Sequence, residues 1–429
     1  MCSLFQSRSQ PHARIELRIL SQGWSMTFRT LDQAGELSRK RVLVRIDLNV
    51  PMQDGRITDD TRLRAALPTI RLLAERGAKV VLLTHFDRPE GKRVASMSLR
   101  PTVEPLSALL GQPVTFADDC VGPRAKAAID GLEAGGVTLL ENVRFHTGEQ
   151  ANDLAFAREL AANGDLYVND AFSAAHRAHA STEAIAHLLP AYAGLAMQRE
   201  LEQLERILGK PRRPLMGIVG GSKISTKLDL LKNLVSRLDR LAIGGGLANT
   251  FLFAQGWTVG ASHVEKALAQ TVHEIERLAE QNHCELLLPT DVVVATTLEP
   301  GAPTFVRRRS EVRDDERILD ARPETLATLI RALDGSETLI WNGPLGVFET
   351  PPFDRGTVET ATAAAALTRG GKLVAVAGGG DTLAAINAAG VADDFTFVSA
   401  AGGAFLEWIA GKTLPGVAAL NLTEANVTG

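Results

Sequence analysis

The sequence predicts an α/β protein made of two doubly wound domains with mainly parallel sheets, joined by a hinge helix. Short apolar, β-branched runs alternate with helical patterns along the chain, which is typical of repeated β-α-β units. A length of 429 residues suits two domains of roughly 200 residues each. Many of the apolar runs end in glycines or charged residues, which is where open parallel sheets bind ligands.

The expected strands are the apolar runs themselves. In the first half they are Val42–Ile46, Lys79–Leu83, Val137–Leu140 and Leu166–Val168. In the second half they are Leu215–Val219, Leu241–Ile243, Leu286–Leu288, Thr338–Trp341, Lys372–Ala377 and Phe395–Ser399. Helical periodicity predicts helices over Asp60–Glu75, Thr226–Leu238, Glu265–Gln281 and Phe353–Leu367.

We divide the chain into four segments. Residues 1–25 are expected to be a leader that is disordered or not translated, with Met26 as the real start; their few acids and several arginines point only weakly to a transit peptide. Residues 26–195 and 196–410 are the two predicted domains, and 411–429 a segment that packs back on the first. Leucines with helical spacing near 193–209, closed by Gly209 and Pro211, predict the hinge helix, although an ordinary surface helix has the same pattern.

Composition excludes several classes of protein. The net charge of −4 argues against a nucleic-acid binder, which usually has a strong basic excess. No run approaches the roughly 18 apolar residues that span a bilayer, so no membrane segment is expected. The three cysteines lie far apart, which favours a reducing compartment, the cytoplasm, over a disulfide framework.

Cationic side chains gather at strand ends and loops of the first half. Each alone would be an ordinary surface or structural residue, but together they suit a small anion with a phosphate and a carboxylate. They are Arg62, His85, Arg88, Arg144, His176, Arg177 and His179. Asp47 and Asn49 follow the first strand with a spacing of two, which would place them on one side of the sheet. Turn chemistry before Pro51 explains that spacing equally well.

Glycine turns mark the second half as a nucleotide domain. Gly220 and Gly221 precede Lys223 and Lys227, which we expect on one face of a helix, aimed at phosphates. This is neither a P-loop nor a dinucleotide fingerprint.

A second group of glycines opens predicted helices. Gly378, Gly379 and Gly380 lead to Asp381 in a first helical turn, where free N–H groups bind anions. Asp381 would hold magnesium beside bound phosphates, or serve only to start the helix. Gly402 and Gly403 repeat the plan, and two helix N-termini aimed at one phosphoryl group suit phosphoryl transfer.

Taken together, these stretches resemble the phosphoglycerate kinase family over about residues 27 to 420. The matching segments are RIDLNVP, TRLRAALPTI, ENVRFH, YVNDAFSAAHRAHAS, STKLDLLKNL, IGGGLANTFL, LPTDVVVA, WNGPLGVFE, GGGDT and LPGVAAL. The resemblance implies reversible, Mg²⁺-dependent phosphoryl transfer between ATP and 3-phosphoglycerate, giving ADP and 1,3-bisphosphoglycerate in glycolysis and gluconeogenesis. It also implies a monomer whose two domains close around the ligands.

The same resemblance assigns roles to individual residues. The 3-phosphoglycerate site of the first domain would consist of Asp47, Asn49, Arg62, His85, Arg88, Arg144 and Arg177. The nucleotide site of the second would consist of Gly221, Lys223, Lys227, Gly245, Asn342, Glu349, Gly378, Gly379, Gly380, Asp381 and Thr382. The catalytic residues would be Arg62, Lys227, Gly380 and Gly403, with Asp381 as the magnesium ligand.

The chain departs from the family pattern at a few positions. Asp87 stands where the family has glycine and brings a carboxylate close to the anion site, where it would repel the substrate. Ser173-Ala174 replaces Gly-Thr, Ser222 replaces alanine, and residues 320–325 read DARPET. Ala400, Ala401 and Phe405 are also unusual, and Phe405 removes a hydroxyl near a phosphate-binding helix start.

Two other functions compete with this one. A nicotinamide-dependent dehydrogenase would also have glycine turns, but it needs a G-x-G-x-x-G turn with an acid about 20 residues further on, and here the glycines are consecutive. A catalytically impaired nucleotide-binding relative would explain the departures, but Lys227, Arg62 and Asp381 are retained.

Overall fold

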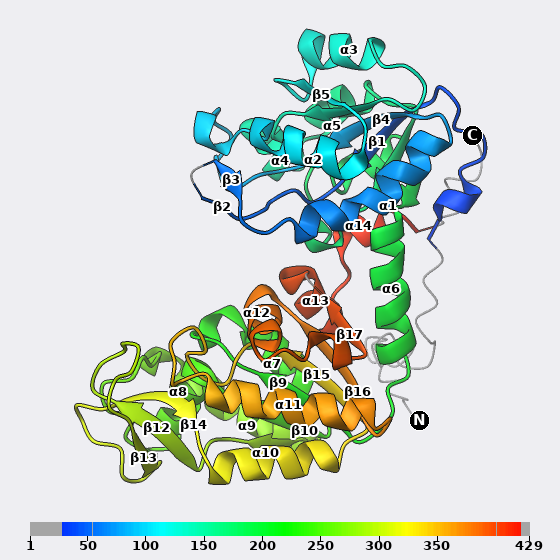
Figure 1. Cartoon of the computed structure of the whole chain (residues 1–429). Coiled ribbons are helices and arrows are strands. Elements are labelled where there is room, and N and C mark those ends of the chain that lie inside the picture. Colours follow the sequence, from blue (N-terminus) through cyan, green and yellow to red (C-terminus); the bar gives the residue numbers. More distant parts are fainter. Residues whose placement is uncertain (1–27, 54, 400, 422–429) are drawn as a thin grey trace, which may run out of the picture.

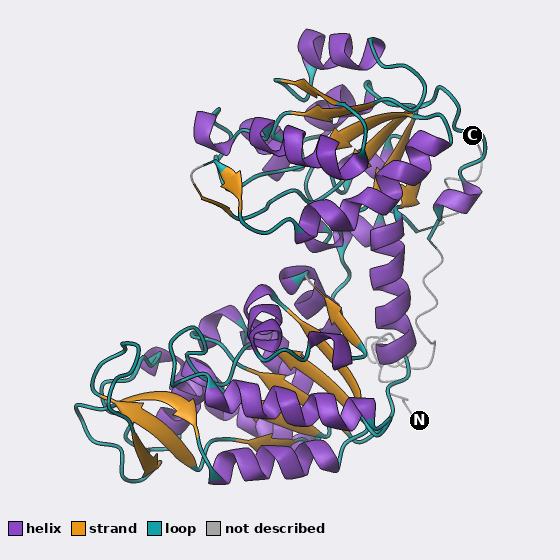
Figure 2. Ribbon diagram, in the orientation of Figure 1, coloured by secondary structure: helices purple, strands orange, loops and turns teal. Residues whose placement is uncertain are grey.

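A computed structural model describes residues 28–53, 55–399 and 401–421 and shows two lobes joined by one long helix (Figure 1). Helices cover both faces of the central sheet in each lobe (Figure 2). This confirms the predicted α/β class with two mainly parallel sheets. The predicted leader, residues 1–25, lies outside the described residues. Within the described ranges, no helix has the length and apolar character that crossing a bilayer requires.

The sheet of the first lobe has six parallel strands. Their spatial order is β5 (Val114–Ala117), β6 (Val137–Leu140), β4 (Lys79–Leu83), β1 (Arg41–Arg45), β7 (Leu166–Asn169) and β8 (Ala191–Ala193). The chain fills one side of β1 with β4, β5 and β6 before it crosses to β7 on the other side. The carboxyl end of β1 therefore lies at the point where the strand order reverses, which is where open α/β sheets bind ligands.

Alternation along β1 shows how this sheet is buried on both faces. Val42 and Val44 belong to the core on one face, and Leu43 belongs to the core on the other. The helices that cover the sheet are α1 (Thr61–Glu75), α2 (Val103–Leu110), α3 (Gly122–Asp130), α4 (Thr147–Gln150) and α5 (Leu154–Ala161). A two-stranded ribbon, β2 (Met52–Gln53) with β3 (Arg56–Ile57), precedes α1.

The second lobe repeats this plan. Its six parallel strands lie in the order β11 (Glu285–Leu287), β10 (Arg240–Ile243), β9 (Leu215–Val219), β15 (Thr338–Asn342), β16 (Val374–Gly378) and β17 (Phe397–Ser399). Here the order reverses between β9 and β15. The helices are α7 (Leu228–Val235), α8 (Gly245–Ala254), α9 (Ala269–Gln281), α10 (Glu324–Asp334), α11 (Arg355–Arg369), α12 (Gly380–Ala388) and α13 (Gly402–Ile409).

A small antiparallel sheet, which the sequence analysis did not predict, extends the second lobe. It consists of β13 (Phe305–Arg308), β12 (Asp291–Ala295) and β14 (Arg317–Ala321). Figure 1 shows it at the end of the lobe farthest from the connecting helix. The edge strands β5 and β8 of the first lobe were also not predicted.

The connecting helix α6 (Leu195–Leu208) is anchored at its start by a buried carboxylate. Asp170 Oδ1 accepts the backbone N–H groups of Ala196 and Met197, at 2.8 and 3.1 Å, which satisfies two of the free donors at the helix start. Along the helix the buried side chains are Met197, Leu201, Leu204 and Ile207, spaced for a single face.

After α13 the chain returns to the first lobe. In α14 (Pro415–Ala418), the N–H of Gly416 donates to the carbonyl of Ala175 at 2.9 Å. Asn169 Nδ2 donates to the carbonyl of Gly416. Residues 422–429 lie outside the described part of the chain, and the domain limits given above stay predictions.

Phe405 is the anchor of α13 in the second lobe. Its side chain is fully buried, and a Cβ atom added at Gly378 would lie 2.2 Å from its ring. The unusual phenylalanine therefore fills the core against a glycine of β16.

We expect Phe405→Ala to lower the free energy of unfolding of the second lobe by about 3–5 kcal/mol, because it leaves a cavity in a close-packed core. Urea unfolding followed by tryptophan fluorescence measures this, since Trp257, Trp341 and Trp408 all belong to this lobe. The matched control is Phe305→Ala on β13, where the ring is 51% exposed and the expected change is within about 1 kcal/mol. Equal losses in the two variants would contradict the core role of Phe405.

Candidate active site

An ion pair organises the loop after β1. Arg62 Nη1 donates to Asp47 Oδ2 and to the Asn49 carbonyl, both at 2.9 Å. The N–H of Asn49 donates to Asp47 Oδ1, and Ser173 Oγ donates to Asp47 Oδ2. Burial alone would raise the pKa of Asp47, but His85, the Arg62 guanidinium and the Ser173 hydroxyl together lower it. Asp47 therefore takes part in the local turn through Asn49 and also in an ion pair with Arg62.

Asp87, one of the departures from the family, lies in the next loop with its backbone bonded on both sides. Its N–H donates to Asn49 Oδ1 at 2.9 Å, and its carbonyl accepts from Arg144 Nη1 at 2.8 Å. The residue has φ of +53°, in the left-handed region that favours glycine and that aspartate tolerates. Its carboxylate is on the exposed side of this loop.

Arginines crowd around Arg144 with few acids to balance them. Burial, followed by repulsion from Arg45 and Arg177, lowers the pKa of Arg144 to about 10. Burial and the same three arginines lower the pKa of His179 to about 4. Groups that repel one another in this way are suited to binding an anion, because a bound anion would relieve the repulsion.

The remaining first-lobe candidates lie at the rim of this cluster. Arg88 and Arg177 are exposed, and repulsion from both lowers the pKa of Arg144. Arg177 Nε donates to His176 Nε2 at 3.0 Å. The structure thus brings the predicted first-lobe residues together at the carboxyl end of β1. The buried Arg45, whose partners come from distant segments, was not among the predicted site residues.

In the second lobe, Lys227 lies where β9 and β15 part. Its Nζ donates to the Gly220 carbonyl at 2.5 Å and to Asn342 Oδ1 at 2.7 Å. Burial lowers the pKa of Lys227 to about 8, although Asp381 opposes the shift.

The expectation that Lys223 and Lys227 share a helix face was wrong. They flank a 3₁₀ turn, η8 (Ile224–Thr226), and α7 begins only at Leu228. The Thr226 hydroxyl donates to the Lys223 carbonyl and stabilises this turn in place of a longer helix. Lys223 is exposed, whereas Lys227 is directed inward.

Three glycines connect β16 to α12 beside Lys227. Gly379 has φ of +104°, and a Cβ atom there would lie 2.6 Å from Asn342 Nδ2, so only glycine fits. Asn342 Nδ2 donates to the Gly378 carbonyl, and Thr382 Oγ1 accepts the N–H of Gly343. Around Gly380 no atom lies within 4 Å of an added Cβ, so the start of α12 is open to a ligand.

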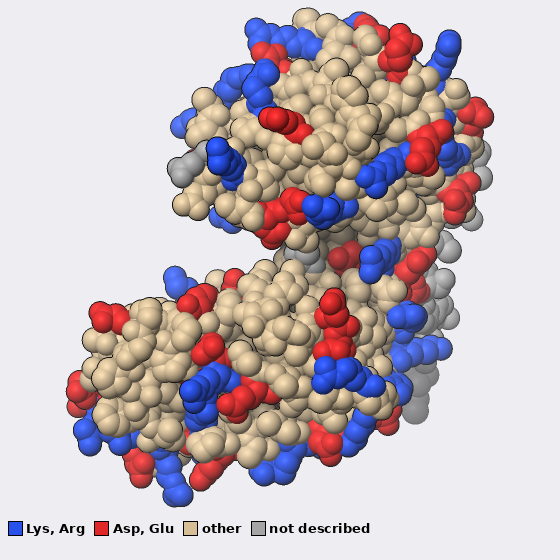
Figure 3. Space-filling view, viewed as in Figure 1, with Lys and Arg blue, Asp and Glu red and all other residues tan. Residues whose placement is uncertain are grey.

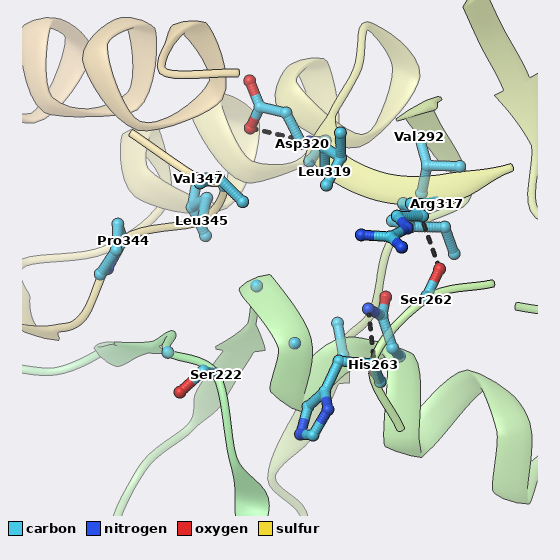
Figure 4. A pocket seen from close by; sticks show the side chains of 18 of the residues that line it. Ser222, Ser262, His263, Val292, Arg317, Leu319, Asp320, Pro344, Leu345 and Val347 are labelled. Atoms are coloured by element: carbon cyan, nitrogen blue, oxygen red, sulfur yellow. Dashed lines mark hydrogen bonds between the residues drawn. The ribbon is translucent and has the colours of Figure 1, made fainter. Parts of the chain in front are cut away.

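A cavity of about 570 Å³ lies beside this loop (Figure 4). Four predicted nucleotide residues line it: Gly221, Gly245, Glu349 and Asp381. Figure 4 shows apolar Leu319, Leu345 and Val347 across the cavity from Ser222 and His263. An apolar wall opposite glycine backbone suits the flat ring of a base. This wall was not predicted, because in the sequence its members resemble ordinary core residues.

The two lobes meet at a smaller cavity of about 90 Å³. Asp47 and Arg62 line it from the first lobe, and Ala401, the residue before α13, lines it from the second. A Cβ atom added at Gly403 would lie 3.0 Å from the ring of His176. The start of α13 therefore reaches the cationic site, and Figure 3 shows the molecule deeply hollowed between the lobes.

Comparison with known proteins agrees with this geometry. The family model described as phosphoglycerate kinase matches residues 31–412. The chain belongs to the phosphoglycerate kinase family. A phosphoglycerate kinase of Caulobacter vibrioides is 67% identical over 395 residues, which cover 92% of this chain and all of that protein.

Solved structures of the phosphoglycerate kinase family have the same fold. The phosphoglycerate kinase of Coxiella burnetii is 42% identical with a TM-score of 0.81, over 92% of this chain and 99% of that one. The enzyme of Pyrococcus horikoshii is 32% identical with a TM-score of 0.77, over 92% and 98% of the two chains.

We expect the ammonium group of Lys227 to titrate near pH 8 in the ligand-free protein, because burial disfavours its charged form. Lysine side-chain NMR across pH 6–11 measures this. The resonance that titrates near 8 should vanish in Lys227→Met and persist in Lys126→Met, an exposed lysine on α3. Its persistence in Lys227→Met would contradict the prediction.

Proposed function

We propose that this protein catalyses reversible, Mg²⁺-dependent phosphoryl transfer between ATP and 3-phosphoglycerate, in glycolysis and gluconeogenesis. One observation carries the proposal: Arg62, from the cationic site, and Ala401, at the start of α13, line the same cavity. A phosphoryl group there would lie between a guanidinium and a helix N-terminus, two groups that stabilise spread negative charge.

The acceptor substrate binds in the first lobe in this proposal. Its phosphate and carboxylate are dianion and anion, and they relieve the repulsion among the arginines around Arg144. His85, Asn49 and Asp47 complete the site with Arg88 and Arg177 at the rim. Arg62 then meets the charge that develops on the transferred group.

The nucleotide binds in the second lobe. Its base enters the apolar cavity beside Gly221 and Gly245, and Glu349 faces the ribose. Its phosphates lie toward Lys223, Lys227 and the glycines that open α12. Asn342 and Thr382 hold that loop in shape by the hydrogen bonds described above.

Asp381 fits the part of a magnesium ligand. Its carboxylate lines the nucleotide cavity and is exposed, and no ion pair of it is found among the described residues. Mg²⁺ is usually held by one or two carboxylates together with phosphate oxygens and water. When bound, the ion supplies charge neutralisation on the nucleotide phosphates.

The reaction itself needs no covalent intermediate on the protein. The carboxylate oxygen of 3-phosphoglycerate and the β-phosphate oxygen of ADP compete for one phosphoryl group in line. Lobe closure brings the cationic site and the adjoining starts of α12 and α13 closer together, and excludes water. Lys227, Arg62 and the N–H groups of Gly380 and Gly403 stabilise the transition state.

Other properties follow from family membership and composition. We propose a monomer of the cytoplasm that acts on small molecules and binds neither nucleic acid nor membrane. The first domain, 26–195, takes 3-phosphoglycerate, and the second, 196–410, takes the nucleotide.

We expect Arg62→Ala to reduce kcat by at least about a hundredfold while the KM for ATP changes less than about threefold, because Arg62 acts on the transition state and lies outside the nucleotide cavity. ATP-dependent turnover of 3-phosphoglycerate, coupled to NADH oxidation through glyceraldehyde-3-phosphate dehydrogenase, measures both. Arg124→Ala, an exposed arginine on α3, is the control. Unchanged kcat in Arg62→Ala would overturn its role, and no turnover by the folded wild type would favour a catalytically impaired relative.

We expect Asp87→Gly to lower the KM for 3-phosphoglycerate about two- to fivefold at low ionic strength, because it removes an exposed like charge and suits the positive φ. Asp87→Asn tests the charge alone, since asparagine also tolerates this conformation. Steady-state kinetics at low and high salt measure the effect, which should shrink with screening. A KM that rises in both variants would show that the carboxylate helps binding.

A further inference from the structure

A buried arginine contacts the predicted substrate histidine from behind. Arg45, the last residue of β1, has no exposed surface. Its Nη2 lies 2.9 Å from His85 Nδ1, and its Nε donates to Ser181 Oγ at 2.9 Å. The third donor, Nη1, is bonded to the Ile46 carbonyl. Each of the three guanidinium nitrogens therefore has a hydrogen-bond partner, which fixes the orientation of the group toward the histidine.

The bond between Arg45 and His85 decides where the ring proton lies. A guanidinium is always protonated in proteins and has no acceptor. His85 Nδ1 must therefore accept, and the ring proton lies on Nε2. A protonated ring would set an N–H against the N–H of Arg45, so the contact also excludes the cationic form.

A second layer of buried groups holds Arg45. Ser181 Oγ donates to Glu149 Oε1 at 2.6 Å, and the Ser181 N–H donates to Glu149 Oε2 at 2.9 Å. Glu149 is fully buried, and its Oε1 lies 3.8 Å from His179 Nδ1. The charge of Arg45 is thus balanced by a carboxylate one hydroxyl away, which lets a cation lie beneath a cationic site.

The charged groups around His85 come from several elements. Arg45 belongs to β1, Asp47 to the loop after it, Arg62 to α1, and Arg144 to the 3₁₀ turn η5 (Val143–Phe145). Burial and the three arginines lower the pKa of His85 well below its usual value, and only Asp47 opposes them. These surroundings therefore favour the neutral form of the ring.

No partner for His85 Nε2 is found among the described residues, and the atom is not among their fully enclosed unpaired atoms. The N–H is therefore a donor that a ligand can reach. A neutral donor binds an anion without changing its own protonation.

We propose that Arg45 is a positioning residue, which keeps His85 as the neutral Nε2–H tautomer so that this N–H donates to an anionic group of the acceptor substrate. The second half of this statement rests on the proposed function, whereas the tautomer does not. Arg45 lines neither cavity described above and acts through the histidine.

Long-range ¹H–¹⁵N NMR on the ligand-free wild-type protein tests the tautomer directly. We expect Nε2 to be the protonated nitrogen and Nδ1 the unprotonated one from pH 6 to 8, with the signals assigned by their loss in His85→Asn. A protonated Nδ1, or a cationic ring at pH 7, would overturn the proposal. This result does not depend on turnover, so an inactive wild type would defeat the proposed function and leave the tautomer decided.

Kinetics test the consequence for binding. Arg45→Met removes the donor and the charge, so we expect a mixture of tautomers and about a tenfold higher KM for 3-phosphoglycerate at pH 8, with less than twofold change for ATP. Because losing Arg45 raises the pKa of His85, the KM of this variant should fall as the pH drops to 6, since the ring becomes a cation that attracts the substrate.

Two further variants separate positioning from general stability. Arg45→Lys keeps a cationic donor and should restore most of the affinity and the pH-independent KM. Arg41→Gln, at the other end of β1, removes an arginine that pairs with Asp165 away from the site, and should leave KM and its pH profile unchanged. A wild-type tautomer and pH profile retained in folded Arg45→Met would overturn the proposal. If Arg45→Met does not fold, the wild-type NMR result decides alone.

Discussion

The structure of the first lobe has to compensate for repulsion among its clustered cations. Arg144 is buried among other arginines, and burial together with their repulsion lowers its pKa to about 10. Such a cluster destabilises the ligand-free fold, and it persists because packing and hydrogen bonds fix each member. Asp47 pairs with Arg62, and Glu149 balances Arg45 through Ser181. In the proposed function, the site is thereby organised for a multiply charged anion before that anion arrives, which reduces the ordering that binding requires.

The second lobe meets negative charge in a different way. It offers helix starts and glycine backbone, with one inward-facing lysine whose pKa is about 8. Lys227 is held by the Gly220 carbonyl and Asn342, two groups at the carboxyl ends of β9 and β15. Phosphate oxygens can replace these neutral acceptors and would favour the charged amine. This lobe therefore avoids the crowding of the first, and its weaker fixed charge suits a ligand that brings its own metal ion.

The sequence predicted the parallel strands well, because buried strands are continuous apolar runs. Lys79–Leu83, Val137–Leu140 and Leu215–Val219 coincide with β4, β6 and β9. In the antiparallel sheet, β13 was missed because exposed residues such as Phe305 weaken its apolar pattern, whereas β12 is a buried run of valines that the prediction overlooked. Residues at strand ends could be placed together, because parallel strands end at one edge. Lys223 could not, because the chain after it forms a 3₁₀ turn, in which the Thr226 hydroxyl donates to the Lys223 carbonyl.

The role of Arg45 could not be predicted for a related reason. Its partners Ser181 and His85 are 136 and 40 residues away in the chain, so no local pattern joins them. The cavity between the lobes could not be predicted either, because it depends on the orientation of α6 relative to the first sheet.

Helix α13 links the chemistry of the two lobes mechanically. Phe405 fixes it in the core of the second lobe, whereas its first turn touches His176 and lines a cavity with Arg62. The start of α12 adjoins that of α13, since a Cβ atom added at Gly402 would lie 3.7 Å from the backbone nitrogen of Gly380. The two helix starts of this lobe therefore form one wall that faces the cationic site. In the proposed mechanism, closure carries the nucleotide and both helix starts together toward the acceptor, and the reverse motion releases the nucleotide.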